Sequence, residues 1–294
     1  MMQAYERLLG TGTRRGVASM TLSMMLFIVN DSLIKVVSAS LAAGQLIAIR
    51  GLIASLIILA IIVGTGAARH LPRAWSAPAV WRGVLDMIGS LLYLLALFHT
   101  PIGNATAINM TSPLGMTAAA ALFLKESVGW RRWSAVVVGF LGVLMVVQPR
   151  PEGFNYWSLL AIAAVFFVVA RDLMTRQMRA DIPSLVIVLS ASVVVMLGAA
   201  AFSLAEGWKP IAWIDIVLLA VAAAFVIGGY SLIVDAMRHG ALSIVGPFRY
   251  TALIWALLSG YLVWGDVPNL LAIAGIIVIV GSGLYVLHRE RIRR

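Results

Sequence analysis

The 294-residue sequence contains no cysteine, and only 12% of its residues are charged, about half the share found in an average soluble domain. The missing cysteines exclude disulfides, thiolate metal sites, cysteine nucleophiles and iron–sulfur clusters. Hydrophobic residues instead make up 62% of the chain, and its mean hydropathy is +0.99. A chain so rich in apolar residues is predicted to be a polytopic membrane protein, with no room for a large soluble domain.

Several catalytic motifs are also missing. No glycine-rich loop is followed by Lys and Ser or Thr, so no P-loop is predicted. The histidines stand singly, without the spacing of metal ligands. No serine–histidine or paired intramembrane aspartate pattern indicates a membrane-embedded hydrolase. The sequence therefore predicts no enzyme activity, no metal and no cofactor.

Ten apolar runs lie along the chain, bounded by Gly, Pro and charged residues: 16–37, 45–64, 78–98, 104–124, 132–148, 156–176, 184–205, 211–237, 241–264 and 268–288. Each approaches or exceeds the roughly 17 to 25 residues that cross the hydrocarbon layer. Helices are expected because backbone in lipid must satisfy its own hydrogen bonds. We therefore predict an all-α protein with ten transmembrane helices. Close helix packing is predicted at small residues, among them Gly139, Gly142, Gly281 and Gly283.

The net charge of +10 arises from 22 basic and 12 acidic residues, and its distribution decides what it means. If the ten runs alternate across the membrane, seventeen of the basic residues lie on one side: Arg7, Arg14, Arg15, Arg69, Arg73, Arg82, Lys125, Arg131, Arg132, Arg171, Arg176, Arg179, Arg238, Arg289, Arg291, Arg293 and Arg294. The positive-inside rule then places both termini in the cytoplasm. Anionic lipid headgroups are natural partners for these residues, and no nucleic-acid partner is predicted.

A weak internal repeat relates the two halves of the chain at a shift of 140 residues. Residues 122–126 (LFLKE) align with residues 262–266 (LVWGD), where an apolar run ends in an acidic residue before another run begins. Each half contains five runs, an odd number, so the second half would enter the membrane inverted. We predict two inverted-topology repeats, 1–150 and 151–294, as in many secondary transporters. Chance similarity between hairpins of like composition is the alternative.

Three segments carry a resemblance to a known family: QLIAIRGLIASL around Arg50, NATAINMTSPLGMTAAAALFLKE at 104–126, and GPFRYTALIWALLSGYLVWGD at 246–266. The chain resembles the drug/metabolite transporter (DMT) superfamily and its EamA-type exporters, although the second half ends in Asp266 where Glu is usual. The resemblance covers essentially the whole chain. More narrowly, the chain is similar to bacterial exporters of amino acids, including aromatic ones, in the cytoplasmic (inner) membrane.

The resemblance implies a secondary transporter that exports small metabolites by alternating access. Its third, fourth, eighth and ninth helices would surround a central cavity, and its partners would be a small-molecule substrate and membrane lipids. A monomer is compatible with the sequence. Other metabolites or drugs are alternative substrates, and a membrane-embedded enzyme, a channel or a scaffold subunit are alternative classes.

Ionisable residues inside predicted spans are costly, so they are functional candidates. We hypothesise an outer polar cluster and an inner polar cluster that close the path alternately. The outer cluster would contain Asp31, Lys35 and Arg50, and the inner cluster Asp172, Arg176 and Arg249. Interfacial anchors that extend their charges to water are the alternative.

Pro113 and Pro247 interrupt the fourth span of each half, a pattern typical of broken helices beside a transport site. Polar and aromatic residues at helical spacing are predicted to line the cavity: Tyr93, Asn109, Ser112, Met116, Tyr230, Ser231, Pro247 and Tyr250. This mixture would suit an amphipathic solute such as an amino acid. Hydrogen bonding between helices is the alternative role for each polar member.

Asp86 follows Arg82 by four residues in the third span. One interpretation is that Asp86 pairs with this arginine on one helix face. The other is that Asp86 is unpaired and buried, in which case it could carry a coupling proton.

Overall fold

The computed structural model describes residues 11–123, 129–148, 156–177, 183–239 and 245–293. All regular structure in these ranges is helical, which confirms the all-α prediction for them. The helices are α2 (Thr11–Val37), α3 (Ala43–Gly64), η1 (Ala67–Trp75), α4 (Ala77–His99), α5 (Ile102–Asn109), α6 (Ser112–Phe123), α7 (Trp130–Val147), α8 (Tyr156–Gln177), α9 (Ser184–Glu206), α10 (Trp213–His239), η2 (Gly246–Tyr250), α12 (Thr251–Ser259), η3 (Gly260–Trp264) and α13 (Leu270–Arg293).

Six helices in the described ranges are long and apolar enough to cross a membrane: α2, α3, α4, α8, α9 and α10. Two shorter apolar helices lie at Trp133–Val147 of α7 and Leu270–Tyr285 of α13. The remaining two predicted spans are divided into shorter helices. Ten crossings and cytoplasmic termini therefore stay predictions, and six clear candidates are established.

The two divided spans each contain a proline at the start of a helix. Helix α5 ends at Asn109, and α6 begins at Ser112, immediately before Pro113. Pro247 lies in the first turn of η2, which leads into α12 and then into the π-helical η3. Proline is tolerated in a first turn because its missing N–H has no helical acceptor there. The interruption predicted at Pro113 is confirmed, and Pro247 is the second residue of a 3-10 segment.

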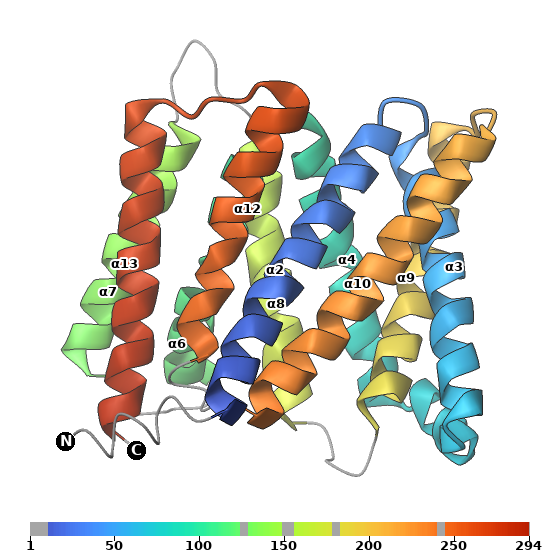
Figure 1. Cartoon of the computed structure of the whole chain (residues 1–294), viewed down its shortest axis with the longest axis horizontal. Coiled ribbons are helices and arrows are strands. Elements are labelled where there is room, and N and C mark those ends of the chain that lie inside the picture. Colours follow the sequence, from blue (N-terminus) through green and yellow to red (C-terminus); the bar gives the residue numbers. More distant parts are fainter. Residues whose placement is uncertain (1–10, 124–128, 149–155, 178–182, 240–244, 294) are drawn as a thin grey trace.

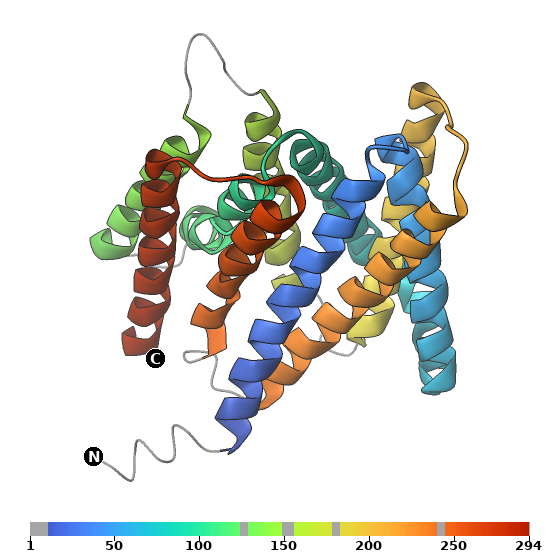
Figure 2. The ribbon, with the colours of Figure 1, turned by 45° about the horizontal axis from the view of Figure 1, so that its top comes forward.

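The long helices lie alongside one another in pairs (Figure 1). Helix α2 packs on α10, α4 on α8, α3 on α9, and α7 on α13. The α3/α9 pair lies at one side of the molecule and the α7/α13 pair at the opposite side, as Figures 1 and 2 both show. The first residues of α2 and the last residues of α13 lie at the same end (Figure 1), which we call the inner end after the predicted topology.

The helix pairs α2/α10 and α4/α8 each contain one close contact between a glycine and a phenylalanine. A Cβ atom on Gly229 of α10 would lie 2.9 Å from the ring of Phe27, and one on Gly89 of α4 would lie 3.2 Å from Cβ of Phe167. A shift of 140 residues carries Phe27 onto Phe167 and Gly89 onto Gly229. The two packing contacts are therefore equivalent under the repeat that the sequence predicts.

Helices α7 and α13 cross at two glycines. A Cβ on Gly142 would lie 2.9 Å from the carbonyl oxygen of Gly275, and a Cβ on Gly275 would lie 2.7 Å from that of Gly142. The close-packing prediction is thus confirmed at Gly142. It is wrong at Gly281, because a Cβ there meets no described atom within 4 Å.

Candidate functional site

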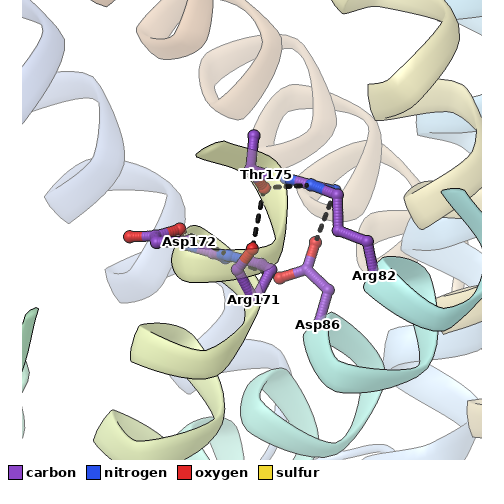
Figure 3. A network of polar contacts seen from close by, with 5 residues as sticks. All are labelled: Arg82, Asp86, Arg171, Asp172 and Thr175. Carbon is purple, nitrogen blue, oxygen red and sulfur yellow. Dashed lines mark hydrogen bonds and ion pairs between the residues drawn. The ribbon is translucent and has the colours of Figure 1, made fainter. Parts of the chain in front are cut away.

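A network of charged side chains joins α4 to α8 near the inner end (Figure 3). Arg171 Nη1 donates to Asp86 Oδ1 at 2.6 Å, and Arg171 also donates from Nε and Nη2 to Asp172 at 2.9 and 2.8 Å. Arg82 Nη1 lies 3.8 Å from Asp86 Oδ2, and its Nε donates to Thr175 Oγ1 at 2.9 Å. We call these five residues the inner network.

The inner network balances two arginines against two aspartates. The side chains of Asp86 and Arg171 are only 17% and 18% exposed, so removing either charge would leave the other poorly compensated. Asp86 is paired, as the first interpretation of the sequence had it, but its short ion pair is with Arg171 rather than with Arg82. The proton-carrier interpretation required an unpaired carboxylate, and this geometry does not provide one.

The predicted inner cluster is arranged differently in the structure. Asp172 accepts its hydrogen bonds from Arg171, its neighbour in sequence. Arg249 lies in η2 with an exposed side chain, and no ion pair joins it to Asp172 in the described ranges. The side chain of Arg176 lies outside the described residues. The structure therefore groups Asp172 with Arg171 on α8 and leaves Arg249 apart.

A second polar group joins α2, α3 and α4 nearer the opposite, outer end. Tyr93 Oη donates to Asp31 Oδ2 at 2.8 Å, and Asn30 Nδ2 donates to Asp31 Oδ1 at 2.9 Å. Arg50 Nη1 donates to Asn30 Oδ1 over a longer 3.4 Å. We call Asn30, Asp31, Arg50 and Tyr93 the outer relay. It combines two residues predicted as a gate with one predicted to line the cavity.

Lys35 does not join Asp31, although the two share a helix face. Its Nζ donates to the backbone carbonyl of Thr100 and lies 5.0 Å from the ring centroid of Trp264. Thr100 lies between α4 and α5, where Pro101 interrupts the helical chain. Lys35 therefore ties α2 to the α4–α5 junction and to η3 at the outer end, rather than to the outer relay.

The other predicted cavity residues fall into several environments. Asn109, Ser112, Met116 and Pro247 are half-buried around the divided helices. Ser231 donates to the carbonyl of Ile227 in its own helix. Tyr250 is 7% exposed and its hydroxyl lies against Gly283 of α13, without a hydrogen-bond partner among the described residues. Tyr250 thus belongs to the packing of α13.

Tyr230 connects the two charged groups. Its ring packs edge-on against Phe27, with centroids 5.1 Å apart, while 45% of its surface is exposed. It interacts electrostatically with Arg171 and Asp86 of the inner network, and Arg50 of the outer relay interacts with both Tyr230 and Asp86. The inner network and the outer relay therefore lie close enough to interact electrostatically, and we call the part of the molecule between them the central region.

Helix α4 shows how the two groups are spaced. Asp86, Ser90 and Tyr93 follow helical spacing on one face. The seven residues from Asp86 to Tyr93 correspond to about 10 Å along the axis. Between the two charged groups lies Ser90, whose side chain is half-buried.

Sequence reasoning missed two members of these groups in their actual roles. Arg171 was assigned to neither predicted cluster, yet it holds the centre of the inner network. The signal was available, because the 140-residue shift aligns it with Asp31. Asn30 was likewise assigned to neither cluster, but its amide joins Asp31 to Arg50.

A pocket of about 290 Å³ also opens in the described part of the molecule, between α5, α7, η3 and α13. Its lining includes Asn104, Gln148, Asp266 and Asn269. Gln148 and Asn269 exchange hydrogen bonds of 2.7 and 3.0 Å across it, which joins α7 to the residue before α13. None of the predicted cavity residues lines this pocket, so it is separate from the central region.

Long apolar helices that enclose two groups of ionisable side chains define a multi-pass membrane protein with a polar interior. A model of the EamA-like transporter family matches residues 14–148 and again residues 155–287. The chain belongs to the EamA-like transporter family, within the DMT superfamily, and is a transporter rather than an enzyme. The family resemblance predicted from the sequence is confirmed.

Several bacterial transporters are similar over most of their length. An S-adenosylmethionine uptake transporter of Rickettsia bellii is 24% identical over 94% of this chain and 94% of its own. A riboflavin transporter of Vibrio cholerae is 31% identical over 71% and 70%. A pseudopaline exporter of Pseudomonas aeruginosa is 27% identical over 91% and 94%. A solved crystal structure with 16% identity shares the fold, with a TM-score of 0.65 over 94% of this chain and 99% of that chain.

Proposed function

We propose that this chain is a secondary transporter that moves small amphipathic metabolites through the central region by alternating access between two inverted repeats, residues 1–150 and 151–294. Two family matches, one in each half, support the repeats. The equivalent pairs Phe27–Gly229 and Phe167–Gly89 support a two-fold relation between them, and the odd number of predicted spans in each half makes this relation inverted. Inverted repeats commonly place a substrate site at their interface, where each half can rock against the other.

The observation that carries the proposal is the position of the two charged groups. The inner network and the outer relay both border the central region, roughly two helical turns apart along α4. Charges within a membrane are expensive, so a protein retains them where they serve a solute path. Groups of both signs, with the exposed ring of Tyr230 between them, suit a solute with charged ends and an apolar body.

Within this class we propose amino acids, including aromatic ones, as substrates and export as the direction in the cell. Similar proteins are named for S-adenosylmethionine, riboflavin and pseudopaline, and these names include both an uptake transporter and an exporter. Family membership thus supports metabolite transport without choosing a substrate, and other metabolites are the alternative. Alternating access is reversible, and gradients decide the direction of net flux.

Counterflow into proteoliposomes tests this function. Vesicles preloaded with an unlabelled amino acid should take up the same labelled amino acid with saturable kinetics, and phenylalanine and tyrosine should be among the best substrates. Riboflavin and S-adenosylmethionine complete the panel, and protein-free vesicles provide the baseline. Saturable flux of a non-amino-acid metabolite alone would contradict the substrate class. If none of the amino acids, riboflavin or S-adenosylmethionine showed saturable flux, the proposed transport of small metabolites would be contradicted.

A further inference from the structure

Arg50 has unused hydrogen-bonding capacity. A guanidinium carries five N–H donors, yet the described residues offer Arg50 only the 3.4 Å contact with Asn30. Its Nε is buried and has no hydrogen-bond partner among them. No carboxylate of the described chain comes within 4.0 Å of it to form an ion pair. Arg171 provides the internal comparison, since it makes three hydrogen bonds of 2.6 to 2.9 Å to two carboxylates.

Arg50 interacts electrostatically with Asp31, but the two do not form a close ion pair, so the guanidinium can still gain hydrogen bonds from an anion that binds beside it. The planar fork of arginine matches a carboxylate with two parallel N–H bonds. Arg50 is therefore prepared for the anionic end of a solute, whereas Arg171 already holds the carboxylates of its own chain.

Asp31 supplies a negative charge on the other side of the Asn30 side chain from Arg50. Its carboxylate accepts from the neutral hydroxyl of Tyr93 and the neutral amide of Asn30. A carboxylate has about four acceptor positions, and no described cation forms an ion pair with this one. Acceptor positions thus remain for an ammonium group.

Asn30 sets the distance between the two charges. Its amide oxygen accepts from Arg50 while its amide nitrogen donates to Asp31, so one planar amide spans the gap. An α-amino acid carries its carboxylate and ammonium groups on a single carbon and spans a similar distance. One helical turn before Asp31, Phe27 packs against the exposed ring of Tyr230 and offers an aromatic surface for an apolar side chain.

We propose that Arg50 and Asp31 form the binding site for the α-carboxylate and the α-ammonium group of a zwitterionic substrate. The inference rests on the proposed transport function and specifies which substrates that function accepts. When no substrate is bound, the Asn30 amide bridges Arg50 and Asp31. When a substrate binds, its carboxylate and ammonium groups replace this amide as the partners of the two residues. A compound that lacks either charged group leaves one of the two residues uncompensated.

Substrate analogues that each lack one charge test the site. The probes are phenylalanine, phenylalaninamide, which lacks the carboxylate, and 3-phenylpropanoate, which lacks the ammonium. Binding of each is measured to the purified full chain and to the Arg50→Gln and Asp31→Asn variants. Arg50→Gln should weaken phenylalanine binding by roughly 10- to 100-fold, while phenylalaninamide changes by less than about twofold. Asp31→Asn should weaken phenylalanine similarly and spare 3-phenylpropanoate.

Arg131→Gln is the matched control, since Arg131 is exposed at the start of α7, belongs to neither charged group, and should leave all three affinities unchanged. Arg50→Lys should recover part of the phenylalanine affinity, and a thermal transition verifies that each variant is folded. Equal weakening of phenylalanine and phenylalaninamide in Arg50→Gln, or no change in either, would overturn the site. Saturable counterflow by a wild-type chain that binds no amino acid would also overturn it, while leaving the transport function standing.

Discussion

Arg171→Gln is expected to abolish transport and to lower the free energy of unfolding by about 2–3 kcal/mol, which is below the cost of removing one partner from a fully buried ion pair because both side chains are partly exposed. The substitution leaves Asp86 with only the 3.8 Å contact to Arg82, in a site where its side chain is 17% exposed. It also removes both hydrogen bonds to Asp172. Denaturant titration in detergent measures the stability, and counterflow measures the transport.

The double variant Asp86→Asn, Arg171→Gln separates the ion pair from the other contacts of Arg171. Removing both charges eliminates the uncompensated carboxylate, so the double variant should regain at least half of the lost stability. Arg14→Gln serves as the control, because Arg14 is an exposed arginine near the inner end and should show no measurable change. An Arg171→Gln variant as stable and as active as the wild type would contradict the role given to the inner network.

Gly275→Val is expected to lower the free energy of unfolding by about 3 kcal/mol, near the upper end of the usual cost of overpacking. Even a Cβ atom at this position would lie 2.7 Å from the backbone oxygen of Gly142 and 2.9 Å from Cβ of Met145. A backbone oxygen cannot rotate away as a side chain can, so α7 and α13 would have to separate. The same denaturant titration measures the effect.

Gly281→Val provides the comparison on the same helix. A Cβ at Gly281 meets no described atom within 4 Å, so only the helix propensities of the two residues differ, and because valine exceeds glycine the stability should be unchanged or slightly higher, by less than about 0.5 kcal/mol. Similar losses for the two variants would show that the α7/α13 crossing does not depend on close glycine contact.

Composition was sufficient to predict the helical membrane fold, and the resemblance carried by three segments predicted the transporter family. Composition acts through the whole chain, since lipid favours helices everywhere. The number of membrane crossings is harder to predict, because the segments around Pro113 and Pro247 each form several short helices instead of one long helix. Local backbone geometry at such breaks is not contained in hydropathy.

Pairing between helices is where the sequence was least informative. Helical spacing predicts neighbours on one helix, such as Arg82 and Asp86, but the stronger partner of Asp86 is Arg171 on another helix. Lys35 similarly does not pair with Asp31, its neighbour on the same helix face. It donates instead to the backbone carbonyl of Thr100 and lies over the ring of Trp264. Which partner such a side chain contacts depends on which helices pack together.

Tyr250 shows the same limit. It was predicted to line the cavity together with Pro247. Residues 246–250 form a 3-10 helix, in which side chains three residues apart eclipse, so Pro247 and Tyr250 still share a face. The hydroxyl of Tyr250 nevertheless lies against α13, and this contact depends on how the helices pack.

The absence of cysteine makes the central claim directly measurable, because a single introduced thiol is the only one in the chain. Ser90→Cys places it on α4 between the inner network and the outer relay. Ala39→Cys in the turn after α2 and Ala68→Cys in η1 provide exposed controls at the outer and inner ends. A membrane-impermeant maleimide should label each control from one side only.

If the central region opens alternately to both sides, the maleimide should label Ser90→Cys from either side of the membrane, and a transported substrate should slow labelling from both. Labelling of Ser90→Cys from one side only, under every substrate condition that supports flux, would contradict alternating access through the central region.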